Sequence, residues 1–532
     1  MKKIILLVQL FAVLSIGTIS AQDHFDALRF SQNFYEGTAR FTSMGGAFAA
    51  LGGDFTSLSI NPAGIGVYRG IEFSMTPAIS YSRTSSAYEN VGGVKDTHTK
   101  FGFSNMGFVS PVYISSSSKG LVNMNVAVGY NKMNNFNSST SSRGRNIAGN
   151  HSLLDNIVYQ ANTIGYHVDE LTANNPYDSR DMYVSDWPVI LAWQSNLLTN
   201  TGTNSFDSKV TYGDHNKFAQ TVSEGAIGEY VISFGGNISH KFYFGFTMGI
   251  QDVDYESNRY YQEAMINPVD LNSFSYRESF RTNGTGYNFK AGVIYRPIPS
   301  LRLAFAAHTP TYFYLTDEYN ASMRADISGF GLYGRSSATP TNFYDYRINS
   351  PYKLIFGGAY TFKSYGLISV DYELVDYSSM RLKEDTHYLS NYNEQAPFYA
   401  ENQMIKNTFR AASNFRVGIE GNLPWRISLR AGYGYYGSPY KSSAGKDTGY
   451  YEDSRGNLMT PTYSMGIGNY TSNVYSAGIG YRFKVGFIDF AYSLTETKVN
   501  YALDSYNEFG VMDGVETKTN FNRFALTLGF KF

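Results

Sequence analysis

The chain has 532 residues, and its 43 Lys and Arg against 44 Asp and Glu give a formal net charge of −1. This balance excludes the basic excess that a nucleic-acid-binding surface needs, so no nucleic-acid partner is expected. The absence of Cys excludes a disulfide framework and a Cys-ligated zinc site. The abundance of Tyr (46), Phe (38) and Gly (51) indicates strands rather than helices.

The first residues have the pattern of a secretory signal. Lys2 and Lys3 precede an apolar run from Ile4 to Ile16, and small residues follow up to Ala21. The run is shorter than the roughly 20 residues that span a bilayer, which argues against the alternative, a membrane anchor. We predict a signal peptide over residues 1–21, cleavage after Ala21 and export from the cytoplasm.

Apolar and polar side chains alternate along many segments with the period of a strand. In the last segment, five apolar residues from Phe524 to Phe532 fall on one face, and Arg523, Thr527 and Lys531 fall on the other. Similar runs predict strands at 71–83, 101–115, 120–133, 226–239, 242–256, 284–296, 300–315, 352–363, 365–378, 407–421, 424–437, 471–483, 486–500 and 518–532.

The connections between these segments alternate between short and long. Links such as 240–241 and 484–485 are short, whereas the longest polar loop covers residues 134–225. A buried sandwich would also give alternating side chains, but it need not separate its connections in this way. We therefore predict an all-β fold, a 14-stranded antiparallel transmembrane β-barrel over residues 71–532, in the lipid bilayer of a Gram-negative outer membrane. The terminal Phe532 suggests a signal for the barrel-assembly machinery.

The segment ahead of the first strand, residues 22–70, is dense in small residues. Small side chains allow short helices and tight turns to fit inside a confined space. A segment of this length can plug the lumen of the barrel that follows it.

This segment resembles the FadL/TodX-type outer-membrane transporters of long-chain fatty acids and other hydrophobic compounds. The elements that carry the resemblance are Gly37, Arg40, Gly45-Gly46-Ala47-x-Ala49, Asp54, Ser57 and Asn61-Pro62-Ala63-Gly64. The resemblance implies a 14-stranded barrel, an amino-terminal hatch of short helices, and a ligand that leaves sideways through the wall. It assigns to the hatch Arg40, Gly45, Gly46, Asp54, Asn61, Pro62, Ala63 and Gly64. A simple turn before the first strand is the other interpretation of residues 61–63, and both can hold.

The longest loop contains two apolar blocks. Apolar residues from Leu154 to Leu171 recur at helical spacing and predict one amphipathic helix. The second block predicts a capture groove for a hydrophobic ligand, made of Trp187, Ile190, Leu191, Trp193 and Leu197. A small loop core that covers the barrel mouth explains the same residues, and the sequence does not decide between the two.

Two further features concern the barrel wall. Pro310 cannot donate a ladder hydrogen bond, so it must lie at a bulge or break, and it is a candidate for the lateral opening. Arg410, Arg416 and Arg430 are expected at the lumen wall, where they attract a carboxylate headgroup or simply link strands.

These features predict passive, hatch-gated uptake of a hydrophobic small molecule, most plausibly fatty-acid-like, although an aromatic hydrocarbon or haem also suits an apolar tunnel. The alternative is an outer-membrane scaffold or shuttle that binds secreted proteins. An enzyme is disfavoured because no nucleophile motif is found, and we expect no cofactor and no metal site.

Overall fold

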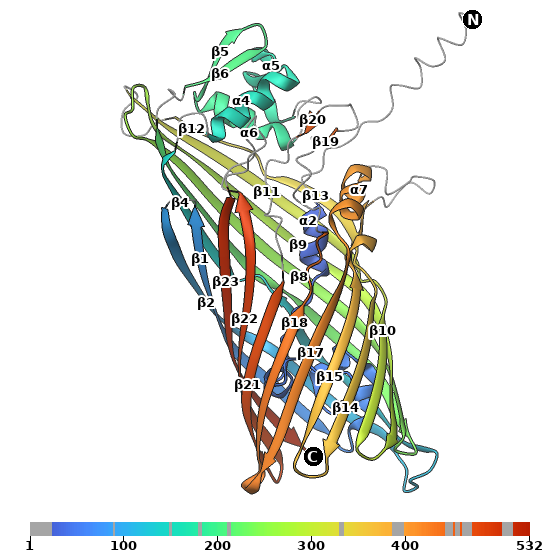
Figure 1. Cartoon of the computed structure of the whole chain (residues 1–532). Coiled ribbons are helices and arrows are strands. Elements are labelled where there is room, and N and C mark those ends of the chain that lie inside the picture. The colour runs from blue at the N-terminus through green and yellow to red at the C-terminus, as the bar shows by residue number, and fades with distance from the viewer. Residues whose placement is uncertain are drawn as a thin grey trace, which may run out of the picture.

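The computed structural model describes residues 24–88, 91–147, 152–178, 184–209, 214–328, 335–385, 398–441, 451–452, 458–459, 471–502 and 514–532. They form a closed antiparallel barrel (Figure 1). In order around the barrel, its 14 strands are β1 (Glu72–Tyr88), β2 (Val91–Ile114), β3 (Leu121–Asn135), β7 (His215–Ile238), β8 (Phe242–Met265), β9 (Leu271–Ile298), β10 (Leu301–His308), β14 (Lys353–Phe362), β15 (Gly366–Asp376), β17 (Ala411–Leu423), β18 (Ile427–Tyr436), β21 (Ser472–Phe483), β22 (Gly486–Ala502) and β23 (Gly514–Lys531).

The last strand closes the barrel onto the first. The β1–β23 ladder runs from Glu72 opposite Lys531 to Tyr88 opposite Val515. Closure gives the backbone groups of both terminal strands partners, as the interior of a bilayer requires. The predicted 14-stranded antiparallel barrel is therefore confirmed.

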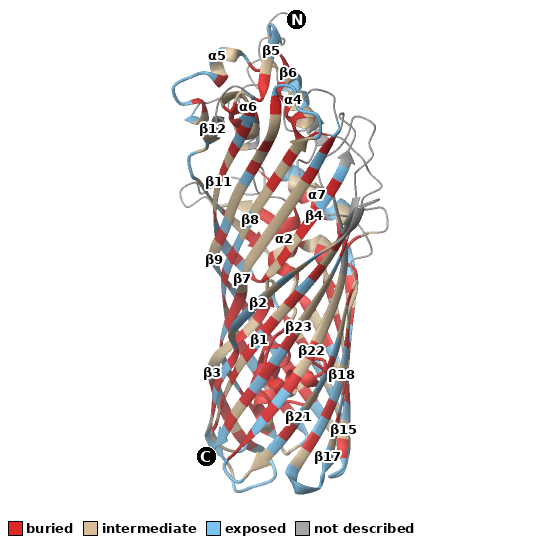
Figure 2. Cartoon of the chain, turned by 90° about the vertical axis from the view of Figure 1, so that its left-hand side faces the viewer, coloured by how far each residue is buried: buried red, intermediate tan, exposed pale blue. Residues whose placement is uncertain are grey.

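The alternation in the sequence corresponds to two faces of the wall, and buried and exposed residues alternate along the strands (Figure 2). In β23, Phe524, Leu526 and Phe530 are exposed outward, whereas Ala525 and Thr527 are buried against the interior. An apolar exterior of this kind is suited to contact with lipid.

Several strands extend further than predicted, on the side of the long loops. Residues 84–100, expected to be a loop, belong largely to β1 and β2. They are rich in Ser, Thr and charged residues and lack the apolar alternation, because a strand that has left the bilayer needs no apolar face. The strands that continue the wall on this side are β4 (Ser138–Ile147), β11 (Tyr312–Ile327), β12 (Arg335–Ala338), β13 (Asn342–Asn349) and β16 (Arg381–Glu384).

Short helices of the amino-terminal segment lie inside the barrel (Figure 1). They are α2 (His24–Ser31), α3 (Ala39–Ser43), η1 (Phe55–Ser59) and η2 (Pro62–Val67). We call residues 24–70 the hatch. The predicted signal peptide, residues 1–21 with its cleavage site after Ala21, lies outside the described residues.

The longest loop folds into a cap above the barrel mouth (Figure 1). The cap contains α4 (Leu153–Ile164), α5 (Val168–Leu171), η3 (Pro176–Asp178), η4 (Val184–Asp186), α6 (Trp187–Gln194), β5 (Leu198–Gly202) and β6 (Ser205–Ser208). The single helix predicted over residues 154–171 is wrong, because Gly165 adopts φ 75° and ends α4. The wall resumes at His215, earlier than the predicted 226.

The remaining elements on this side are η5 (Tyr377–Ser379), α7 (Tyr399–Thr408), β19 (Tyr451–Glu452) and β20 (Leu458–Met459), and η6 (Pro424–Arg426) forms a turn at the opposite end. No helix among the described residues is both long and apolar enough to span a bilayer.

Candidate functional site: the hatch and the lumen above it

Side-chain caps begin three of the hatch helices. The Thr38 hydroxyl accepts from the Phe41 N–H, the Asp54 carboxylate from the Thr56 N–H, and the Asn61 carbonyl from the Ala63 N–H. Such caps satisfy amide groups at the start of a helix that would otherwise have no partner. Thr38 also donates to Asp54 at 2.6 Å, which ties the first two caps together. Burial raises the pKa of Asp54 above its ordinary value.

Asn61 connects the hatch to itself and to the wall. Its amide donates to the Ala49 carbonyl at 2.7 Å and to the Val293 carbonyl of β9 at 3.3 Å. Pro62 follows at the first position of η2, where an N–H group would have no hydrogen-bond partner within the helix. Residues 61–64 thus form a turn, and the first of them is hydrogen-bonded to the wall; the hatch role of this element stays a prediction.

The hatch lies directly against the wall at glycines. A methyl carbon at Gly432 of β18 would lie 2.1 Å from the Gly45 nitrogen, and one at Gly292 of β9 would lie 1.9 Å from Asn61 Oδ1. Gly45 itself has φ +62°, a conformation that side chains disfavour. Within the hatch, Gly64 packs against Gly52 in the same way. Close backbone contact therefore seats the hatch.

A buried ionic cluster links the hatch to three strands. Arg40 donates to both carboxylate oxygens of Glu420, at 2.9 and 3.1 Å. Arg430 donates to Glu420 and to Asp489, each at 2.6 Å. Arg416, beside the hatch residue Gly46, donates to Glu373 at 2.6 Å. Each of these two wall arginines thus pairs with a carboxylate of the wall, which favours the strand-linking interpretation, although Arg416 Nε and Nη1 and Arg430 Nη2 have no hydrogen-bond partner among the described residues. Arg410 is exposed, and its Nε donates to the Ser438 carbonyl at 3.3 Å.

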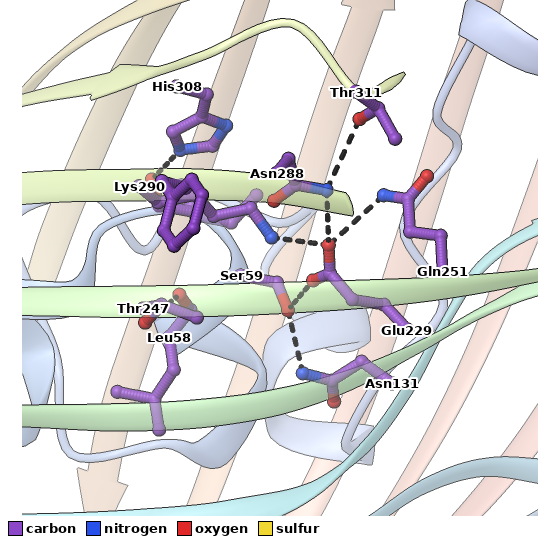
Figure 3. A network of polar contacts seen from close by, with 12 residues as sticks. Leu58, Ser59, Asn131, Glu229, Thr247, Gln251, Asn288, Lys290, His308 and Thr311 are labelled. Atoms are coloured by element: carbon purple, nitrogen blue, oxygen red, sulfur yellow. Dashed lines mark hydrogen bonds and ion pairs between the residues drawn. The ribbon is translucent and has the colours of Figure 1, made fainter. Parts of the chain in front are cut away.

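A second polar network fixes residues 58–60 of the hatch (Figure 3). Glu229 of β7 accepts from Ser59 at 2.8 Å and from Gln251 at 3.0 Å, and it forms an ion pair with Lys290. His308 lies 2.8 Å from the Ile60 carbonyl. Because these groups are buried, they need the partners that the hatch supplies.

Glu36 is a buried carboxylate of the hatch that pairs with cations of the wall. Burial alone would raise its pKa, but Arg523 and Lys132 hold the pKa of Glu36 below its ordinary value of 4.5. A carboxyl group with a lowered pKa stabilises the folded state above its ordinary pKa, and this stability is lost as the pH falls through the lowered value. Asn135 and Ser104 also donate to this carboxylate.

We therefore expect the hatch to become more accessible to protease as the pH falls below about 4.5. Protease protection of the purified barrel measured against pH tests this, with Glu36→Gln as the comparison. The variant should be less protected at neutral pH and should change less with pH. A variant with the same acid response as the wild type would contradict the assignment to Glu36.

Between the hatch and the upper wall lies a cavity of about 330 Å³. Its aromatic and apolar lining includes Phe25, Leu28, Phe41 and Phe136, and Arg29, Glu36 and Arg523 are its charged lining residues. Hydroxyl residues of the lining include Thr495, Thr497 and Thr519 of β22 and β23. A cavity of this size and mixed lining suits a small molecule with an apolar body and a polar end.

Beside this cavity, one stretch of the wall lacks a backbone ladder. The β2–β3 ladder ends at Asn105 opposite Asn131. Further up, β3 continues into β4, which pairs with β7 and, within the described residues, forms no ladder with β2. Side chains bridge the two edges instead: Asp96 of β2 accepts from the N–H and the hydroxyl of Ser141 of β4, at 2.6 and 2.9 Å.

Pro310 lies at a break in the wall between β10 and β11, as a proline requires. The break is bridged, because Thr309 N–H donates to the Phe289 carbonyl at 2.9 Å and Ser350 N–H donates to the Thr311 carbonyl at 3.0 Å. The wall is therefore more continuous at Pro310 than beside β2.

The residues predicted as a capture groove lie in the core of the cap. Trp187, Ile190, Leu191 and Leu197 are buried, and Trp193 is partly buried and packs against Phe206. This placement favours the other interpretation, a loop core that covers the barrel mouth. An exposed groove would require these side chains to leave their present packing.

Sequence reasoning missed the wall residues that receive the hatch, namely Gly292, Gly432, Glu229 and Glu420. Glycines and carboxylates on a lumen face resemble ordinary wall residues in the sequence. The sequence offered only a weak signal for these four residues, because their role depends on which part of the hatch contacts each strand.

The comparisons with known proteins concern the fold. No protein-family model matches the sequence, and neither does any curated protein. Among solved structures, the toluene transporter TodX of Pseudomonas putida has a TM-score of 0.49 at 12% identity, over 94% of this chain and all of its own (100%). A Pseudomonas aeruginosa FadL homologue has a TM-score of 0.47 at 12% identity, over 94% of this chain and 98% of its own. A TodX monoaromatic hydrocarbon channel carrying a deltaS2 mutation has a TM-score of 0.51 at 11% identity, over 93% of this chain and 98% of its own.

The similarity to the deltaS2 variant of the TodX channel supports a shared fold over nearly the whole of both chains. It agrees with the motifs of residues 37–64, which suggested the same family from the sequence alone. The resemblance is therefore confirmed at the level of the fold, and the chain has the barrel fold of the FadL/TodX-type channels.

Proposed function

We propose that the protein is an outer-membrane channel for the passive uptake of hydrophobic small molecules of the fatty-acid type. The observation that carries this proposal is the cavity between the hatch and the wall, next to a stretch of wall without a backbone ladder. The hydrocarbon channel with the same fold supports the class of ligand.

The lining of the cavity supports an amphipathic ligand. An alkyl chain would lie against Phe25, Leu28 and Phe136, and a carboxylate would receive hydrogen bonds from hydroxyls such as that of Thr495. Each methylene removed from water stabilises binding by about 0.8 kcal/mol.

The unpaired edge of β2 reaches down to Ser104, and its lower end, where the apolar outer face begins, supports a lateral exit into the membrane. Phe101 and Phe103 are exposed on the outer face there, so the opening would face lipid rather than water. A hydrophobic ligand that leaves by this route avoids the aqueous end of the barrel. The hatch would close the straight path and direct the ligand sideways.

A scaffold for secreted proteins needs an accessible apolar surface on the long loops. The apolar residues of the cap that could offer it are largely buried, which favours the channel.

The test is to purify the barrel from the outer membrane in mild detergent and to identify bound small molecules by native and denaturing mass spectrometry. We expect a bound lipid of the fatty-acid class, and we expect Thr495→Trp to lose it because the indole fills the cavity. The matched control is Leu526→Trp on the outer face of β23, where the side chain is 40% exposed. Loss of the lipid from both variants, or a secreted protein in place of the lipid, would count against the channel.

A further inference from the structure

The end of the barrel with the short turns carries a ring of positive charge. Its turns cover residues 115–120, 239–241, 299–300, 363–365, 424–426 and 484–485, and they contain no Asp or Glu. Among the described residues, the exposed cations at this end that form no ion pair with Asp or Glu, here called the basic rim, are Arg69, Lys119, Lys241, Lys363, Arg426 and Lys484. Since the whole chain has a net charge of −1, this charge is concentrated and not a general property of the surface.

Carboxylates neutralise little of this charge. Glu72 forms an ion pair with Lys531 at 3.0 Å, and Lys531 is outside the rim as defined. Arg69 Nη2 lies 2.9 Å from His240 Nδ1, in the turn between β7 and β8. Burial and the charges of Arg69 and Arg296 lower the pKa of His240, so the imidazole adds little positive charge of its own.

The position of the rim along the barrel corresponds to lipid headgroups. Apolar residues exposed on the outer wall reach the turns themselves, as Phe362, Leu423 and Val485 do. Trp425 and Tyr365 within the turns are 83% and 75% exposed. Aromatic and basic side chains at the end of an apolar wall are typical of the membrane interface.

We propose that the basic rim binds the anionic headgroups of phospholipids in the leaflet around the short-turn end. The cations occupy turns distributed around the whole barrel, which matches a surrounding ring of lipid, whereas a protein partner would contact one side. Anionic lipid attracts each nearby Lys or Arg at short range. This proposal concerns the lipid outside the wall and is independent of the ligand inside it.

The test uses the full barrel in detergent with equal amounts of phosphatidylglycerol and phosphatidylcholine, and native mass spectrometry measures which lipid is retained. We expect the wild type to prefer phosphatidylglycerol. In the variant Lys363→Gln, Arg426→Gln, Lys484→Gln this preference should fall at least about fivefold. It should also weaken with added salt in the wild type.

The matched control removes three exposed cations on the side of the long loops, by Lys95→Gln, Arg324→Gln and Lys406→Gln. This control should keep the preference, and so should the charge-conserving variant Lys363→Arg, Lys484→Arg. A wild type without preference, a rim variant that keeps it, or an equal loss in the control would overturn the proposal.

Discussion

Replacing Gly432 by Ala is expected to displace the hatch and to make the barrel conduct ions. A methyl group there would lie 2.1 Å from the Gly45 nitrogen and 2.2 Å from the Met44 carbonyl carbon. Both are backbone atoms, so they cannot yield as a flexible side chain does. Overpacking of this kind costs about 1–3 kcal/mol. That free energy corresponds to a roughly 5- to 150-fold larger population of barrels with the hatch unseated.

Single-channel recordings in planar bilayers measure this effect, and protease accessibility of the hatch gives a second readout. The matched control is Gly358→Ala, because Gly358 also lies on a wall strand but a methyl group there meets no atom within 4 Å. It should behave like the wild type. If Gly432→Ala folds and keeps both low conductance and a protected hatch, close contact at Gly45 is not what seats the segment.

The sequence predicted the wall better than the parts that lie inside or above it. A lipid-facing strand must present apolar side chains at alternate positions, and Phe524, Leu526 and Phe530 show this directly. Residues 84–100 form strands under no such requirement, so their alternation is lost although their backbone is paired. Periodicity therefore marks the bilayer-embedded part of each strand and not its full length.

The hatch could be predicted from its motifs, but its binding partners could not. Asn61 and Asp54 reveal themselves as caps because the side chain and the backbone it serves are neighbours in the sequence. Glu420 is far from Arg40 in the sequence, and Glu229 is far from Ser59. Only the closed barrel brings these groups together.

The cap shows a different limit. Apolar residues such as Trp187 and Leu197 in a polar loop are consistent with either binding or burial, and composition alone gives no basis for a choice. The structure packs them together with residues of the upper barrel strands. Gly165 is the sequence feature that indicates two helices, because a glycine that follows a helical run commonly ends the helix.

A covalent link between β2 and β4 is expected to abolish uptake of the ligand while leaving the barrel folded. Asp96 and Ser141 face each other across the two edges, with the carboxylate 2.6 Å from the Ser141 nitrogen. The chain contains no Cys, so Asp96→Cys, Ser141→Cys introduces a single possible disulfide. Such a bond lies above the apolar part of the edge, holds the two edges within about 7 Å between Cα atoms, and so keeps them from separating below it, as lateral exit needs.

Uptake of a fluorescent fatty acid by cells that carry the double variant measures the effect. The oxidised form should take up no more than cells without the barrel, and a reductant should restore uptake in the same cells. The two single Cys variants control for loss of the Asp96 contact and should be insensitive to oxidation. Undiminished uptake by a variant whose disulfide is verified by mass spectrometry would exclude this edge as the exit. The break at Pro310 would then be the remaining candidate.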